Sequence, residues 1–98
     1  MVKHIVMFKL KGDDLSRRET ALRFKSALDA LPEQIDVLQS IETALNENPS
    51  EDWDIVLTAV VPTLEDVATY AKHPAHVAAA AIIKDAKESR ACVDYEVL

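Results

Sequence analysis

Glycine and cysteine are scarce in this sequence, and each shortage excludes a class of function. Gly12 is the only glycine among the 98 residues, so the chain has no glycine-rich loop that could cradle a phosphate. Cys92 is the only cysteine, which excludes an internal disulfide and fits a reducing compartment.

Basic residues are also few, since 11 lysines and arginines stand against 17 acidic residues and give a formal net charge of −6. A nucleic-acid-binding domain usually shows a basic face, and an anionic membrane surface attracts basic segments, so we expect neither partner. No apolar run approaches the roughly 20 residues of a membrane-spanning helix. The first residues, MVKHIVMFKLKG, are interrupted by lysines and lack the layout of a signal peptide, so we expect a cytoplasmic protein.

The composition is that of an ordinary globular protein, with 49% hydrophobic and 29% charged residues. The length suggests one domain with one modest core, so we expect a single domain over residues 1–98.

Alternation and helical spacing predict the elements of the first two thirds of the chain. Residues 2–10 alternate as a strand that is apolar on both faces. Residues 13–32 predict a helix with a Ser16–Glu19 capping box at its start and Pro32 as its stop signal. Residues 35–45 and 53–61 predict the second and third strands.

Proline divides the next helical region. Thr63 is the expected N-cap of a short helix through Ala71. The residue before a proline avoids helical angles, so His73 should mark a corner and Pro74 should begin another helix. This second helix is alanine-rich and is expected over residues 74–89, followed by a fourth strand over residues 91–97.

These elements predict an α+β fold, a ferredoxin-like β-α-β-β-α-β sandwich with four antiparallel strands and a second helix broken at Pro74. The helices can cover only one face of the sheet. The other face carries Ile5, Met7, Val56 and Val60. Because a small protein rarely leaves such an apolar face in water, we expect a homodimer paired through its sheet faces, a dimeric α/β barrel.

The segments VKHIVMFKLK, YAKHPAH and VDYEV resemble the stress-responsive dimeric α/β-barrel (Dabb) family, and the similarity in pattern runs over essentially the whole chain. The most specific piece is Y-x-x-H-P-x-H, followed by a helix and a V-D-Y strand. The resemblance implies ferredoxin-like subunits that pair through their sheets. Many family members have no assigned reaction, but one plant member is a polyketide cyclase that closes an aldol ring.

The resemblance to the cyclase implies three catalytic residues, which are His4, Tyr70 and His76 with His76 as the base. The helix after His76 is alanine-rich where the cyclase is bulkier and more aromatic, so the substrate of the cyclase does not carry over. The residues themselves suit the role, because a helix N-terminus disfavours the imidazolium and a general base must be neutral. The tyrosine hydroxyl could orient His76 or polarise a carbonyl.

Several structural interpretations compete with catalysis. His4 could be a hydrogen-bonded core histidine, and Tyr70, His73 and Pro74 could simply pack and cap a corner. His73 and His76 have a spacing used at zinc sites, but they would need Glu65 or Asp66 as further ligands. We therefore expect no metal and no cofactor, although a magnesium ion at a carboxylate-rich surface is compatible with the composition. Cys92 is expected to pack as a small hydrophobic residue.

The sequence leaves three hypotheses open, and whether the chain is an enzyme is not decided. It could be an acid–base enzyme acting on an enolisable carbonyl compound, with a small carbonyl or carboxylate ligand. It could bind a small apolar or carboxylate ligand without turnover, or it could be a stress-associated structural protein whose dimer or larger assembly is the active form. A cavity of about 300 Å³ or more, lined by His4, Tyr70 and His76, would favour the first two hypotheses, and a filled core would favour the third.

Overall fold

The computed structural model describes residues 1–97, and its elements follow the predicted order β-α-β-β-α-α-β. The elements are β1 (Val2–Leu10), α1 (Asp14–Asp29), the 3₁₀ turn η1 (Leu31–Glu33), β2 (Ser40–Leu45), β3 (Ile55–Val61), α2 (Leu64–Lys72), α3 (Pro74–Ala81) and β4 (Lys87–Glu96).

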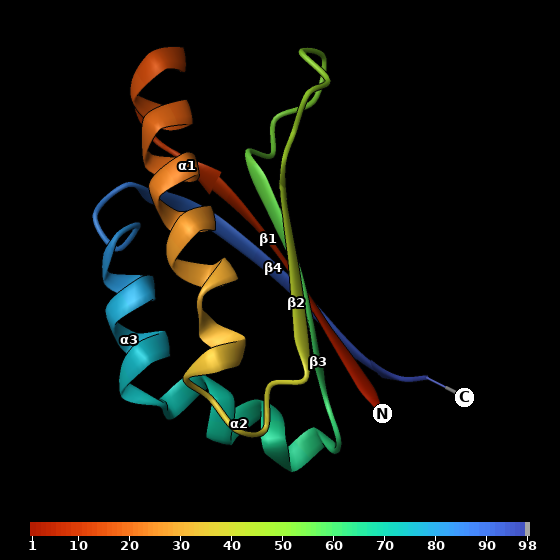
Figure 1. Ribbon diagram of the computed structural model, residues 1–98. Helices are drawn as coiled ribbons and strands as arrows, with labels where there is room; N and C mark the ends of the chain where they lie inside the picture. The colour runs from red at the N-terminus through yellow and green to blue at the C-terminus, as the bar shows by residue number, and fades with distance from the viewer. Residues whose placement is uncertain (98) are drawn as a thin grey trace.

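The strands form one four-stranded sheet in the order β2-β3-β1-β4, and every neighbouring pair is antiparallel. The three helices lie on one side of this sheet and leave its other side bare (Figure 1). The ferredoxin-like architecture predicted from the sequence is therefore confirmed. Among the described residues, no helix is long and apolar enough to cross a membrane.

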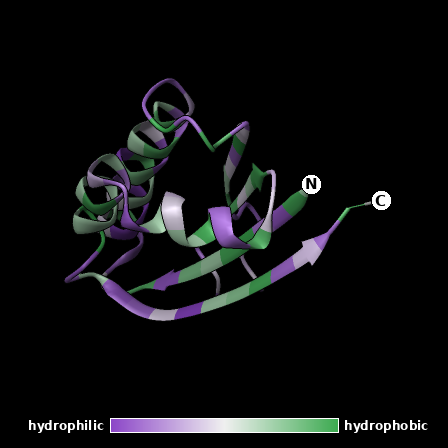
Figure 2. Cartoon of the chain, turned by 90° about the horizontal axis from the view of Figure 1, so that it is seen from below, coloured by the Kyte–Doolittle hydropathy of each residue, from purple (hydrophilic) through white to green (hydrophobic). Residues whose placement is uncertain are grey.

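The central strand β1 shows why the two faces of the sheet differ. Its residues alternate between buried and half-buried along the whole strand. Val6 and the residues two positions before and after it face the helices and are buried. Ile5 and Met7 face the bare side and are half-buried. The edge strand β4 carries hydrophobic residues in its middle between hydrophilic ends (Figure 2).

One core fills the space between the sheet and the helices. It contains Ala21, Phe24 and Leu28 of α1 and extends to Tyr70 at the corner between α2 and α3. Its buried residues are Val2, Val6, Phe8, Leu10, Ala21, Phe24, Leu28, Leu31, Ile35, Leu38, Ile55, Leu57, Ala59, Val61, Tyr70, Ala79 and Ile83. The core thus packs directly against the residues proposed from the sequence as a site.

The predicted capping box of α1 is wrong. The helix begins at Asp14, and its N-cap is Asp13, whose carboxylate accepts a hydrogen bond from the Ser16 amide at 2.8 Å. Ser16 therefore lies inside the first turn and does not cap the helix. Gly12 precedes the cap with a φ of +112°, a left-handed conformation that glycine adopts without strain and that turns the chain from β1 into α1.

The second and third strands are shorter than predicted. Residues 35–39 form turns and irregular chain, although Ile35 and Leu38 are buried in the core. Their apolar pattern therefore reflects packing beneath α1 and not strand pairing. The third strand begins at Ile55, two residues later than Trp53.

The second half of the predicted last helix is also wrong. Helix α3 ends at Ala81 instead of residue 89, and β4 begins at Lys87 instead of Ala91. Strand β4 pairs with β1 along the whole length of β1, with an irregularity next to Leu10. This tertiary pairing overrides the local helix propensity of residues 87–89, and residues 82–86 form the turn before the strand.

Candidate active site

The three residues singled out from the sequence meet at one cavity. His4 comes from β1, Tyr70 from the last turn of α2 and His76 from the first turn of α3. The cavity has a volume of about 150 Å³ and is lined by His4, Val6, Phe8, Phe24, Leu57, Tyr70, His76, Ala80, Ile83, Lys87 and Arg90. It is about half the size named above for a binding cavity, so the core is neither filled nor open enough for a large ligand.

The break between α2 and α3 positions Tyr70 and His76. Thr63 and Asp66 form a capping box that fixes the start of α2. His73 adopts an extended conformation, with φ −61° and ψ 136°, and ends that helix. Its Nδ1 atom then accepts a hydrogen bond from the Ala75 amide at 3.0 Å, so His73 caps α3 as the structural interpretation predicted. Pro74 occupies the first turn, where its missing N–H costs nothing.

The Tyr70 ring lies between the two histidine rings. Its centroid is 4.6 Å from that of His76 and 5.9 Å from that of His4, with both pairs edge to face. Tyr70 is only 1% exposed, and His4 is 7% exposed. These rings pack as a rigid group whose polar atoms are largely shielded from bulk water.

Two polar atoms of this group have no hydrogen-bond partner among the described residues. They are the Tyr70 hydroxyl and the His76 Nδ1 atom, and both are buried. Leaving a buried polar group unpaired costs about 1–3 kcal/mol. A ligand with a polar group of its own would satisfy both atoms.

Burial changes the pKa of Tyr70 and of His76 in the direction that favours the neutral form of each. Desolvation raises the pKa of Tyr70 to about 12, while the charge of Arg90 acts in the opposite direction. Desolvation also lowers the pKa of His76 below its usual 6.5. A hydrogen bond of the ring to the Ala71 backbone opposes this shift, and the charges of His4 and Arg90 add to it. At neutral pH the site therefore offers a phenol that can donate and an imidazole that can accept a proton.

His4 has a partner that the sequence reasoning missed. Its Nδ1 atom bonds to a carboxylate oxygen of Asp94, the residue opposite it in the β1–β4 register. Because a carboxylate only accepts, the Nδ1 atom must carry a proton, and this bond fixes the orientation of the ring. The only feature of the sequence that pointed to Asp94 was the V-D-Y motif. It became informative once the register of β4 against β1 was known.

Cys92 also lies at His4, and the prediction that it packs as a small hydrophobic residue is wrong. The cysteine is exposed, and its Sγ atom is 3.5 Å from His4 Nδ1 and 4.0 Å from Asp94 Oδ1. The donor atoms of His4, Cys92 and Asp94 lie within 4.8 Å of one another, so this is the group that could hold a soft divalent ion. His73 is not among these residues, because its Nδ1 caps α3.

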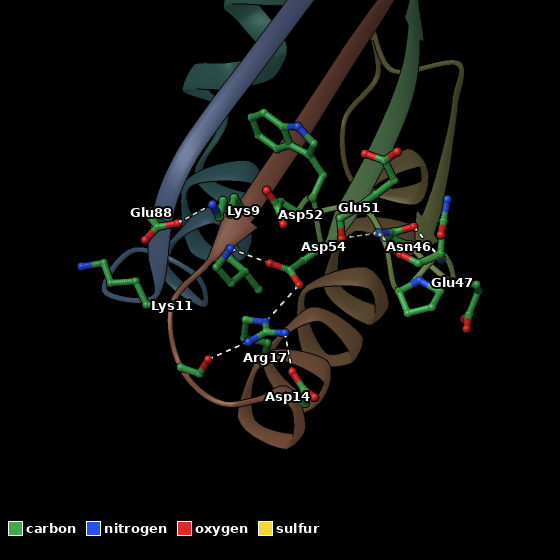
Figure 3. Close-up of a pocket in the computed structure, with 15 residues that line it drawn as sticks. Lys9, Lys11, Asp14, Arg17, Asn46, Glu47, Glu51, Asp52, Asp54 and Glu88 are labelled. Atoms are coloured by element: carbon green, nitrogen blue, oxygen red, sulfur yellow. Dashed lines mark hydrogen bonds and ion pairs between the residues drawn. The ribbon is translucent and has the colours of Figure 1, made fainter.

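A larger polar hollow lies around the loop between β2 and β3 (Figure 3). Its volume is about 650 Å³. Arg17 binds the Asp14 carboxylate at 2.6 Å, the Asp54 carboxylate at 3.2 Å and the Gly12 carbonyl at 2.7 Å. Asp54 also accepts from the Leu10 amide at 2.7 Å, so these groups satisfy one another and fasten the end of β1 to α1.

Replacing Tyr70 with phenylalanine tests whether its hydroxyl lacks a partner. We expect Tyr70→Phe to raise the free energy of unfolding by roughly 1 kcal/mol, because it removes an unpaired buried hydroxyl and keeps the ring. Tyr70→Ala is the control and should cost about 3–5 kcal/mol through lost packing. Urea unfolding gives both values. A loss of 1 kcal/mol or more in Tyr70→Phe would mean that the hydroxyl is already bonded within the protein.

The lowered pKa of His76 predicts a pH dependence of stability. Since the folded value lies below the unfolded value of about 6.5, protonation favours the unfolded chain. The contribution of neutral His76 is complete above the unfolded value and is lost as pH falls through the folded value. The unfolding free energy of the wild type should therefore approach that of His76→Gln as pH falls below about 6.5. NMR titration of the His76 ring, folded and in urea, measures the two pKa values directly, and a higher pKa in the folded state contradicts the prediction.

Comparisons with known proteins agree with this fold. A dimeric protein of unknown function and ferredoxin-like fold from Bacteroides fragilis is 49% identical, with 98% of this chain and 95% of that chain covered and a TM-score of 0.94. A protein of Arabidopsis thaliana is 24% identical over 100% and 96% of the two chains, with a TM-score of 0.80. A Dabb family protein with a ferredoxin-like fold from Mesorhizobium loti is 23% identical over 99% and 96%, with a TM-score of 0.73.

No curated protein matches the chain. The sequence model of the stress responsive A/B barrel domain family, however, matches residues 2–97, which is nearly the whole sequence. The pattern of Y-x-x-H-P-x-H and V-D-Y, the sheet order and this match agree with one another. The chain belongs to the stress-responsive A/B barrel domain (Dabb) family.

Proposed function

We propose that this protein is an acid–base enzyme that moves a proton next to the carbonyl group of a small molecule. His76 is the base, and Tyr70 and His4 assist it. The observation that carries the proposal is the pair of buried, unpartnered polar atoms, Tyr70 Oη and His76 Nδ1, at one cavity. Evolved cores rarely keep such groups unpaired, so they mark a place where a ligand completes the hydrogen bonding.

The proposed step removes a proton from the carbon next to the carbonyl. The neutral His76 imidazole accepts this proton, and the electron pair of the broken C–H bond moves into the carbonyl to form an enolate. The Tyr70 hydroxyl donates a hydrogen bond to the enolate oxygen, where the negative charge develops. Its raised pKa keeps the phenol protonated and able to donate at neutral pH. Return of the proton from His76 restores the enzyme.

His4 supports this step through its pairing with Asp94. The carboxylate fixes a proton on Nδ1 and holds the ring in one orientation. The His4 ring packs edge to face on Tyr70, so it also helps to hold the phenol in place.

The volume of the cavity bears on the size of the substrate. The resemblance to a polyketide cyclase supports proton chemistry beside a carbonyl. A cavity of about 150 Å³, however, corresponds to about five water volumes of roughly 30 Å³. We therefore infer a short carbonyl compound and not a long polyketide chain as the substrate.

We also propose that the protein is a homodimer paired through the bare face of its sheet, in which Val93 is 55% and Tyr95 is 44% exposed. The similar Bacteroides fragilis protein is described as dimeric. The alternative function is a stress-associated binding or structural homodimer without turnover. The dimer itself is compatible with either function, because the cavity lies on the opposite side of the sheet.

We infer a cytoplasmic location from composition, because the only cysteine is Cys92 and it is exposed as a free thiol.

Hydrogen–deuterium exchange on the substrate tests the enzyme proposal. Short β-keto and 2-oxo compounds are incubated with the protein in heavy water, and NMR follows loss of the proton beside the carbonyl. We expect exchange above the buffer rate with the wild type and at least a hundredfold slower exchange with His76→Ala, in line with the usual contribution of a general base. His73→Ser is the matched control, since serine can cap α3 in place of His73. Exchange that survives His76→Ala, or that no compound shows, contradicts the proposal.

The dimer is tested by sedimentation equilibrium at micromolar concentration. Val93→Glu places a charge on the bare sheet face and should raise the dimer dissociation constant at least tenfold, because burying an unpaired charge is costly. Val77→Glu is the matched control, since Val77 is 56% exposed on the helix side of the molecule. A monomeric wild type, or equal effects of the two substitutions on the dissociation constant, would contradict the prediction.

A further inference from the structure

Two cationic residues line the cavity, and neither has an ionic partner. Lys87 and Arg90 come from the start of β4 and are exposed, whereas Tyr70 lies at the buried end. Within residues 1–97, neither side chain forms an ion pair or a hydrogen bond. Other cations of the chain do find partners, as Arg17 does with Asp54 and Lys25 with Asp29.

The cavity is also free of acidic residues, although the chain as a whole is acidic. The described lining residues include two cations, two histidines, one tyrosine and otherwise apolar side chains, with no aspartate or glutamate. The chain nevertheless has a formal net charge of −6. Two acidic residues of β4 lie near the lining residues, and each is paired: Asp94 with His4, and Glu88, next to Lys87, with Lys9 at 3.3 Å. The mouth of the cavity is therefore a local positive region on an acidic protein.

Arg90 lines the same cavity as the two residues that the proposed chemistry uses, and its charge acts on both. It lies opposite Phe8 in the β1–β4 register, and Phe8 also lines the cavity. The positive charge of Arg90 acts on both Tyr70 and His76, lowering the pKa of each. The guanidinium therefore lies within electrostatic range of the phenol and of the imidazole.

We propose that Arg90, assisted by Lys87, binds the carboxylate of the substrate and makes the site selective for short keto acids. This inference rests on the proposed function and names its substrate class. The carboxylate lies at the cavity mouth against Arg90, and the keto group lies deeper, within reach of the Tyr70 hydroxyl and of His76. A ligand of this kind satisfies the two unpaired buried atoms and the two unpaired cations together.

Arginine suits this role better than lysine does. Its planar guanidinium donates two parallel hydrogen bonds to a carboxylate, whereas an ammonium acts as a flexible point charge. A positive charge near the enolate oxygen also stabilises the second negative charge that develops when a keto acid loses its α-proton. The cavity volume of about 150 Å³ fits on the order of five to seven non-hydrogen atoms.

The test compares acetoacetate with its uncharged methyl ester, two ligands that share the keto group and differ in charge. Calorimetry or NMR titration gives the two dissociation constants for the full-length protein. We expect the wild type to bind acetoacetate at least tenfold more tightly than the ester, with a preference that falls as salt rises. Arg90→Gln should abolish the preference, and Arg90→Lys should keep part of it. Arg23→Gln makes the same change in net charge on an exposed part of α1 and should leave the preference intact.

The outcomes separate this inference from the proposed function. Arg90-dependent binding of acetoacetate without exchange of its α-protons supports the anion site and contradicts the enzyme. Exchange at equal rates on acid and ester, unaffected by Arg90→Gln, contradicts the anion site and supports the enzyme. Failure to bind acetoacetate, or an equal loss of affinity in Arg23→Gln and Arg90→Gln, overturns the inference.

Discussion

The break between α2 and α3 at His73 and Pro74 is the constraint on which the site depends. Pro74 lacks the N–H that a continuous helix would need, and it keeps His73 out of helical angles. The chain therefore turns between Tyr70 and His76 and brings the two rings to a centroid distance of 4.6 Å. In an unbroken helix two residues six positions apart would point about 120° away from each other around the axis, so their rings would not meet. A backbone restriction thus creates the contact on which the proposed chemistry rests.

The site combines structural support with polar groups that the fold leaves unpaired. His73 caps α3, Asp94 holds His4, and the Tyr70 ring packs between two histidines. The supporting hydrogen bonds are made, but the phenol hydroxyl and the His76 Nδ1 atom are not paired with described residues. Such an arrangement costs stability in the free protein, and a ligand that supplies the missing partners recovers it. Stability and binding should therefore respond in opposite directions to loss of the Tyr70 hydroxyl.

The architecture could be predicted from the sequence because period-two alternation, one helical stripe and the prolines all pointed to the same fold. The bounds of α1, α3 and β4 could not be predicted in the same way. The carboxylate of Asp13 outcompeted the predicted Ser16 cap, and pairing with β1 drew residues 87–89 out of the alanine-rich helix. Both errors come from interactions whose strength local spacing does not reveal.

The convergence of His4, Tyr70 and His76 followed from motif and strand face, but the partners of these residues did not. Asp94 and Arg90 reach the site only through the register of β4 against β1, which fixes His4 opposite Asp94 and Phe8 opposite Arg90. A slip of one residue would turn both side chains to the other face of the sheet. Cavity volume was also beyond the sequence, because it depends on how closely α3 packs over the sheet. These missing facts are the ones that decide the size and charge of the ligand.

The most direct test of the account is a crystal structure of the protein soaked with an unreactive analogue of a short β-keto acid. The account predicts ligand density in the cavity, with the carboxylate on Arg90 and a second oxygen within roughly 2.6–3.2 Å of the Tyr70 hydroxyl. Density for an ordered water that bridges Tyr70 and His76, with the analogue absent or bound elsewhere, would contradict it.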